Sequence, residues 1–203
     1  MSYRINNRIT FLHISKTAGT SISHWIKDNH PFEFSNHRHD KWQDLPEAWR
    51  DNVFCVVRNP YERAVSFFTF ARTVLTSKKR HHGDPKRTKQ QLRELDKGFK
   101  HFIMNAGKFD IAKAPNRPSH LWYEVPQLNW LPKDLSKITL LRMETLQRDF
   151  GEFAGKHDLK GPALPYKNVS AGRSNYRNFY DEETKAEVEK HYGEDIAKLG
   201  YEF

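Results

Sequence analysis

The chain has 203 residues, of which 37% are hydrophobic, 13% are aromatic and 29% are charged, and its formal net charge is +9. This length and composition exclude a disordered polypeptide and suit one domain with a hydrophobic core. The positive charge favours an anionic partner: nucleic acid, an acidic membrane face, an acidic glycan or a phosphorylated small molecule.

The N-terminal segment and the cysteine content predict a soluble protein of the cytoplasm. Residues 1–14 lack the apolar run and the cleavage site of a signal peptide, and no stretch reaches the ~20 apolar residues of a membrane span. The single cysteine, Cys55, excludes an internal disulfide, and its place in the apolar run VFCVV predicts a buried thiol.

Apolar runs and turn signals predict strands and helices in alternation along the chain. Strands are expected at residues 9–14, 53–57 and 138–142, where apolar and β-branched residues gather. Helices are expected at residues 20–29, from Pro60 to residue 75, at 99–106, from Glu144, and from Asp181, a good N-cap, to the C-terminus. This order predicts one α/β domain over residues 1–203, with a parallel sheet flanked by helices in three layers.

Residues 76–98 are polar and basic, and the stretch from Lys78 to Arg93 contains seven Lys or Arg but a single acid, Asp84. Gly83 and Pro85 should break any helix, so the segment is expected to form a basic loop or flap. A solvated surface loop and a flap that meets an anionic acceptor or cofactor both remain open.

The first predicted strand leads into the loop HISKTAGTS, which has the composition of an anion-binding turn. Amide groups at a helix start point towards a ligand, Gly19 allows close approach of the backbone, and Lys16 adds a positive charge. Thr17, Thr20 and Ser21 add hydroxyl groups. The loop is not a P-loop of the form G-x-x-x-x-G-K-[ST], because its lysine precedes the glycine, and this disfavours a magnesium nucleotide. The alternative is an ordinary turn whose hydroxyls cap the helix.

A second cationic motif follows the strand at 53–57. Arg58 comes directly after that strand, and at the carboxyl end of a parallel strand it would face the ligand crevice. Ser66 lies on the following helix, and an arginine fork together with a hydroxyl suits a phosphate. Two such motifs on adjacent strands predict a nucleotide with two anionic ends. An Arg58–Glu62 ion pair at the helix start is the alternative for this motif.

The two motifs resemble those of the sulfotransferases. HISKTAGTS is similar to their 5′-phosphosulfate loop and VVRNPYERAVSFF to their 3′-phosphate motif, most closely in the carbohydrate-type family of heparan sulfate 2-O- and chondroitin or dermatan 4-O-sulfotransferases. LLRMETLQRDF and the closing YDEETKAEVEKHYGEDIAKLGYEF also resemble the family's C-terminal half, whereas Ser15 departs from its usual proline. The resemblance implies a P-loop NTPase-like sulfotransferase fold, and the lack of a signal anchor points to a bacterial or viral relative.

The resemblance also implies a donor and the residues that bind it. The donor would be 3′-phosphoadenosine 5′-phosphosulfate (PAPS), with adenosine 3′,5′-bisphosphate (PAP) as the product and no metal required. The 5′-phosphosulfate would be held by Lys16, Thr17, Ala18, Gly19, Thr20 and Ser21. The 3′-phosphate would be held by Arg58 and Ser66, and by Arg173 in a loop that closes over the nucleotide, where Asn168 and Ser170 are further candidates.

The acceptor hydroxyl needs a base with a pKa near the working pH, which favours histidine. The segment SNHRHDKW offers His37 and His39 at the position where the resemblance implies a catalytic histidine; His37 is preferred, and Glu33 is an alternative. Lys16 would stabilise the charge that grows on the leaving phosphate. His13 is expected to be a structural neighbour of the loop rather than a base.

A glycan or glycolipid hydroxyl is the preferred acceptor, ahead of a small alcohol or a peptide tyrosine, and no specific nucleic acid is expected. A nucleotide-dependent phosphoryl transferase is an alternative, although G-K-[ST] and a Walker-B-like aspartate are missing. A nucleic-acid-binding protein would explain the basic segment but not the basic and hydroxyl residues at two strand ends. A donor-binding relative without activity is disfavoured by the intact Lys16, Arg58 and Ser66.

Overall fold

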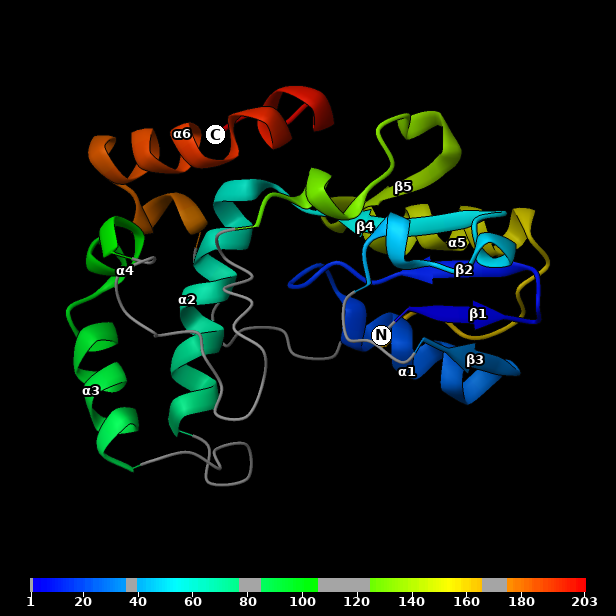
Figure 1. Ribbon diagram of the computed structural model, residues 1–203, viewed down its shortest axis with the longest axis horizontal. Coiled ribbons are helices and arrows are strands. Elements are labelled where there is room, and N and C mark those ends of the chain that lie inside the picture. The colour runs from blue at the N-terminus through cyan, green and yellow to red at the C-terminus, as the bar shows by residue number, and fades with distance from the viewer. Residues whose placement is uncertain (1, 36–39, 77–84, 106–124, 166–174) are drawn as a thin grey trace. The chain divides into compact units, whose positions relative to one another are not determined.

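A computed structural model describes residues 2–35, 40–76, 85–105, 125–165 and 175–203 of the chain (Figure 1). The chain divides into two compact units. The first unit is made of Met1–Asn59 and Gln127–Val169, and the second of Pro60–Pro126 and Ser170–Phe203. Each unit has its own hydrophobic core.

The first unit is built on a mixed five-stranded sheet with the strand order β3-β1-β2-β4-β5. The strands are β1 (Tyr3–Ile5), β2 (Ile9–Leu12), β3 (Phe32–Phe34), β4 (Val53–Val57) and β5 (Ile138–Arg142). β2, β4 and β5 run parallel, whereas β1 is antiparallel to both β2 and β3. The predicted α/β class is therefore confirmed, but the prediction of a wholly parallel sheet is wrong.

A tight turn explains why the sheet is mixed. Asn6 and Asn7 have positive φ angles of 49° and 56°, and the Arg8 N–H donates to the Ile5 carbonyl at 3.0 Å. Two successive left-handed residues form a type I′ turn, which reverses the chain and pairs β1 with β2 as a hairpin. β1 and β3 escape prediction from the sequence because strands of three residues are too short for a periodic pattern.

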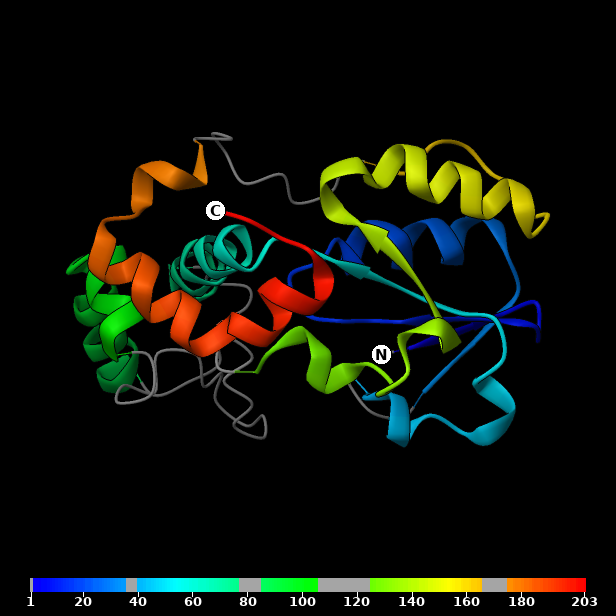
Figure 2. The same ribbon diagram turned by 90° about the horizontal axis from the view of Figure 1, so that it is seen from above.

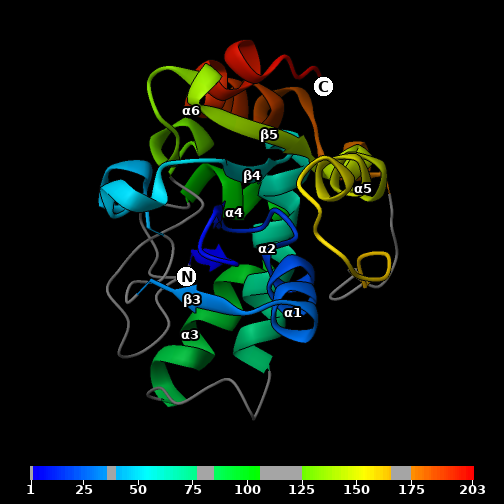
Figure 3. The same ribbon diagram turned by 90° about the vertical axis from the view of Figure 1, so that its right-hand side faces the viewer.

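Helices α1 (Gly19–Asn29) and α5 (Leu146–Lys156) cover one face of this sheet (Figures 2 and 3). Their apolar sides meet buried strand residues, and the ring centroid of Phe54 lies 5.1 Å from that of Phe11 and 4.5 Å from that of Phe153. In the described part of this unit, the opposite face is covered by 3₁₀ turns and irregular segments within residues 40–50 and 127–137. The second helical layer that the sequence predicted is therefore not found within this unit.

The second unit is helical in the residues that the structure describes. Its helices are α2 (Pro60–Thr76), α3 (Pro85–Asp96), α4 (Phe99–Asn105) and α6 (Glu182–Leu199). α2 and α3 lie side by side, and α6 packs against α2 and α4 (Figure 1). Phenylalanine and tyrosine rings from α2, α4 and residues 176–180 fill the core between them. Of the helices described in the whole chain, none is long and apolar enough to cross a membrane.

The predicted N-cap of the last helix is confirmed. The Asp181 carboxylate accepts the Thr184 N–H at 2.9 Å, and the Thr184 hydroxyl accepts the Asp181 N–H at 2.9 Å, which completes a capping box. Lys100 lies 2.9 Å from the same carboxylate. The hydrogen bond from Lys100, followed by those from Thr184, holds the pKa of Asp181 well below its usual range.

The basic segment forms a helix over Pro85–Asp96, so the prediction of a loop is wrong for these residues. Pro85 takes the first helical position, where its missing N–H costs nothing, and Gly98 follows the helix with a φ angle of +96°. Leu95 is buried whereas Lys89 and Arg93 are exposed, as in an amphipathic helix on a surface. Residues 77–84 of the segment lie outside the described residues.

The thiol of Cys55 should be inert in the folded protein. Cys55 lies within β4 with no exposed surface, as its apolar neighbours predicted, and burial raises the pKa of its thiol. Ellman's reagent should therefore label no thiol in native buffer and the single thiol of the chain in denaturing urea. Rapid stoichiometric labelling of the native protein would contradict the buried position.

Candidate active site

Two strand ends bring the predicted motifs to one edge of the sheet. β2 and β4 are parallel neighbours with Leu12 opposite Cys55, so their carboxyl ends lie side by side. The chain leaves β2 through residues 13–18 and leaves β4 at Arg58. The Arg58 Nη1 group donates to the Lys16 carbonyl at 3.2 Å, and this bond joins the first motif to the second.

The loop before α1 has a strained backbone. Lys16 and Ala18 have positive φ angles of 67° and 58°, whereas Thr17 between them does not. The left-handed conformation costs roughly 1–2 kcal/mol per non-glycine residue, and such strain is concentrated at functional sites. A turn of this kind directs successive N–H groups into a concave nest, which suits an anion.

The start of α1 adds positive potential to this loop. Ala18 is the N-cap residue, no side chain caps the helix, and no acidic residue lies in the first turn. The helix dipole therefore presents its positive end to the loop, where Lys16 contributes a full positive charge. The N-cap position itself holds no hydroxyl group, because Ala18 has none.

The hydroxyl groups of the loop differ in their surroundings. Thr17 is fully buried, and its hydroxyl donates to the Ile14 carbonyl at 2.9 Å. Ser21 is also buried, whereas Thr20 is exposed. The Thr17 side chain thus stabilises the loop, and a contribution of Thr17 to ligand binding would come from its backbone N–H.

Gly19 is required by the ring of His13. A Cβ atom at Gly19 would lie 1.6 Å from His13 Nε2, so any larger residue would displace the imidazole. The His13 ring stacks on Phe11 with centroids 5.6 Å apart. The predicted place of His13 as a neighbour of the loop is confirmed.

Two side chains that the sequence did not single out hold the backbone at the second motif. The Gln127 amide accepts the Arg58 N–H at 2.9 Å and donates to the Arg58 carbonyl at 2.8 Å. Glu144 Oε1 accepts the Asn59 N–H at 2.7 Å. The sequence indicates this role of Gln127 only through the position of its polar amide within the largely apolar segment VPQLNWLP.

The other predicted site residues are not joined to this loop by the described contacts. His37, His39 and Arg173 lie outside the described residues, as do Asn168 and Ser170. Ser66 is buried on α2, in the second unit. Glu33, the alternative base, is exposed on the edge strand β3.

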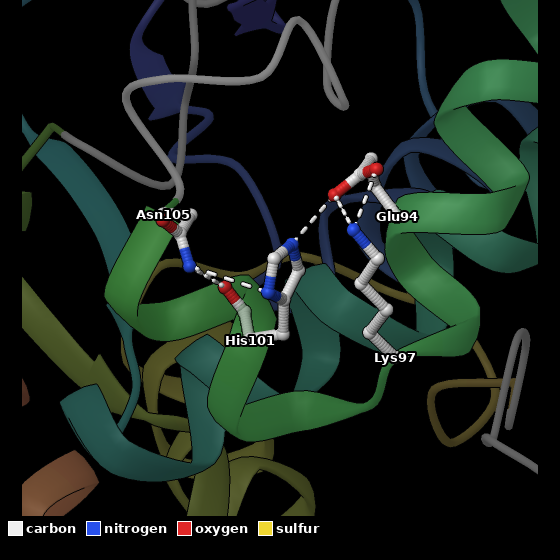
Figure 4. Close-up of polar contacts among 4 residues, drawn as sticks. All are labelled: Glu94, Lys97, His101 and Asn105. Carbon is white, nitrogen blue, oxygen red and sulfur yellow. Dashed lines mark hydrogen bonds and ion pairs between the residues drawn. The ribbon is translucent and has the colours of Figure 1, made fainter.

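A further histidine, His101, belongs to a polar cluster of the second unit (Figure 4). Its Nε2 lies 2.7 Å from Glu94 Oε2, its Nδ1 lies 3.3 Å from the Asn105 amide, and Lys97 lies 2.8 Å from the same carboxylate. The Lys97 hydrogen bond, and to a lesser degree that of His101, lowers the pKa of Glu94. Through its contact with Glu94, His101 links α3 to α4. Within the described ranges, no group of three or more His, Cys, Asp or Glu side chains could hold a metal ion.

The first unit has an α/β fold. The loop that follows its parallel strand β2 has a backbone that suits an anion. A family model described as Sulfotransferase family matches residues 3–202. The chain therefore belongs to the sulfotransferase family, whose members transfer sulfuryl groups. A comparison with curated proteins finds no match, and a comparison with solved structures finds none either.

Replacing Gly19 by alanine should disrupt the loop. The new Cβ must push His13 from its place, and overpacking of this kind costs about 1–3 kcal/mol. Gly151→Ala on α5 is the matched control, because a Cβ there meets nothing within 4 Å and alanine favours the helix. Thermal unfolding should show a lower Tm for Gly19→Ala and an equal or higher Tm for Gly151→Ala. An unchanged Tm for Gly19→Ala would contradict the close His13 contact.

Proposed function

We propose that this sulfotransferase moves a sulfuryl group from PAPS to an acceptor hydroxyl, by in-line displacement, and that the acceptor is a carbohydrate. The observation that carries the proposal is the strained loop of Lys16 and Ala18, which Arg58 joins at the end of β4. The donor has an anionic group at each end of its nucleoside, and the chain has a cationic motif after each of two neighbouring strands.

The described residues fit the donor's 5′ end. The nest of N–H groups, the positive end of α1 and the Lys16 ammonium together suit a phosphate or sulfate group. Gly19 leaves room for the ring of His13 at the helix start. In this proposal Thr17 and Ala18 contribute their N–H groups, and Thr20 and Ser21 contribute N–H or hydroxyl groups.

The 3′-phosphate is proposed to bind Arg58 and Ser66, with Arg173 as a further ligand. The Arg58 guanidinium has several N–H donors, and one of them is engaged by the Lys16 carbonyl. Ser66 and Arg173 are assigned from the sequence motifs alone. The family match covers residues of both units, which supports the proposal that they form one sulfotransferase domain with a P-loop-like fold.

Catalysis would depend mainly on positioning and on stabilisation of charge. When bound, PAPS supplies the sulfuryl group and PAP as the leaving group. Lys16 would neutralise negative charge at the 5′ end, and the loop N–H groups would orient the same group. His37, with His39 as second candidate, would accept the proton of the acceptor hydroxyl, an assignment that rests on the segment SNHRHDKW. No metal is proposed to take part.

Isothermal titration with PAP tests the donor assignment directly, with 5′-AMP and ATP–magnesium as comparison ligands. The protein should bind PAP more tightly than 5′-AMP. Arg58→Ala should abolish this preference, because the guanidinium group proposed to bind the 3′-phosphate is lost. Arg148→Ala is the control, since Arg148 is an exposed arginine of the same unit on α5. Equal affinities for PAP and 5′-AMP would overturn the proposal, and preferred binding of ATP–magnesium would favour a phosphoryl transferase. Tight, strongly salt-dependent DNA binding would favour the nucleic-acid alternative.

Lys16→Ala should lower the transfer rate by ~10²-fold or more, as expected when one donor to a developing negative charge is removed. The measurement is PAP release from PAPS in the presence of a panel of sugar, glycolipid and phenol acceptors. Lys27→Ala is the matched control, because Lys27 is an exposed lysine in the last turn of α1, the helix that follows the Lys16 loop. A Lys16→Ala variant with the native rate would exclude Lys16 from the reaction.

A further inference from the structure

Arg58 is the first residue beyond β4, so its peptide groups lie past the end of the ladder that pairs β4 with β5. At Arg58 the Gln127 side chain makes the hydrogen bonds that a paired strand would make. Its Oε1 accepts the Arg58 N–H at 2.9 Å, and its Nε2 donates to the Arg58 carbonyl at 2.8 Å. One amide thus satisfies both polar groups of a single residue, as a paired strand would.

The environment makes these two bonds strong. Gln127 has no exposed surface, and the 3₁₀ turn Gln127–Trp130 that carries it includes the buried ring of Trp130. Water cannot compete for either bond at such a site, and breaking one would leave a buried polar group without its partner. Asn59, the next residue, is held by Glu144 through its N–H at 2.7 Å. Two side chains therefore hold two consecutive residues at the end of β4.

The same contacts reach the loop of residues 13–18 through Arg58. The guanidinium of Arg58 donates to the carbonyl of Lys16, the first of the two left-handed residues. The direction of that side chain depends on the orientation of its own backbone, which the Gln127 amide holds from both sides. A series of described bonds thus leads from Gln127 through Arg58 to Lys16.

We propose that Gln127 is a positioning residue for donor binding, which holds Arg58 in the orientation that binds the 3′-phosphate and supports the Lys16 loop. The proposal rests on the proposed function for the identity of the ligand. Gln127 does not touch the donor in this proposal and acts only through Arg58. Its amide is required because the Arg58 backbone offers one donor and one acceptor, and only a group with both can match them.

Gln127→Glu tests this requirement with almost no change in shape. An ionised carboxylate has two acceptors, so it would keep the bond from the Arg58 N–H but repel the Arg58 carbonyl. A protonated carboxyl has a donor and an acceptor, as the amide does. Burial raises the pKa of a carboxyl, so the variant should recover as the pH falls from about 8 to about 6.

The readout is the affinity for PAP and for 5′-AMP, measured by titration calorimetry. The native protein and the Gln127→Glu variant are compared at about pH 8 and at about pH 6. At about pH 8, Gln127→Glu should bind PAP about tenfold more weakly than the native protein and should lose most of its preference over 5′-AMP. At about pH 6 the ratio of the two PAP affinities should return towards one. Gln91→Glu is the matched control, because Gln91 is also buried but belongs to α3 in the other unit. Its PAP affinity should stay native at both pH values.

A change in Tm alone, with native PAP affinity and native preference at both pH values, would overturn the positioning role. If Gln127→Glu is unfolded at the higher pH, Gln127→Met, which keeps the length of the side chain without its hydrogen bonds, replaces it. The Met variant should show the weaker PAP binding at both pH values, and native binding would again overturn the proposal.

Hydrogen exchange of the ligand-free proteins separates this proposal from the proposed function. Gln127→Glu should exchange faster than the native protein at about pH 8 in peptides that cover residues 13–19 and 56–60, and Gln91→Glu should not. If the native protein shows no preference for PAP, the proposed function fails, and the exchange result alone decides whether Gln127 supports the loop. Native exchange in both peptides of the Gln127 variant would overturn that support.

Discussion

The parallel pairing of β2 with β4 is the constraint on which the rest of the first unit depends. Both strands are buried along their whole length, so a shift of register by one residue would exchange the side chains that pack on the two faces of the sheet and disrupt the packing on each. The hydrophobic core therefore determines the register, and the register places the carboxyl ends of the two strands next to each other. The contact between Arg58 and Lys16 follows from that placement.

The loop of residues 13–18 stores strain that its surroundings offset. Two left-handed residues and a helix start without a side-chain cap are unfavourable in isolation. The buried Thr17 hydroxyl, the His13 ring against Gly19 and the Arg58 guanidinium oppose this cost from three sides. In the proposed function, a loop already held in this shape would not have to be organised by the donor. Gln127 extends the same support to the residue that joins the two motifs.

Local patterns in the sequence determined much of this protein. The central strand at 53–57, the helix that begins at Pro60 and the cap of the last helix at Asp181 follow from apolar periodicity and from preferences at helix ends. The two cationic motifs were visible because each is a short run of residues around one strand end. The family match over residues 3–202 agrees with the class of enzyme that these motifs indicated. All of these features depend on residues that are close together in the chain.

Only the tertiary structure decided the features that depend on distant residues. A turn with two left-handed asparagines made the sheet mixed, and Pro85–Asp96 became a helix because Leu95 finds a place in the core of the second unit. The sequence motif predicted Thr17 among the residues that bind the donor, but in the structure its hydroxyl is buried and donates to the Ile14 carbonyl. Gln127 reaches Arg58 across 69 residues of chain. Partners so far apart leave no local pattern, because their contact exists only when the sheet has brought the two segments together.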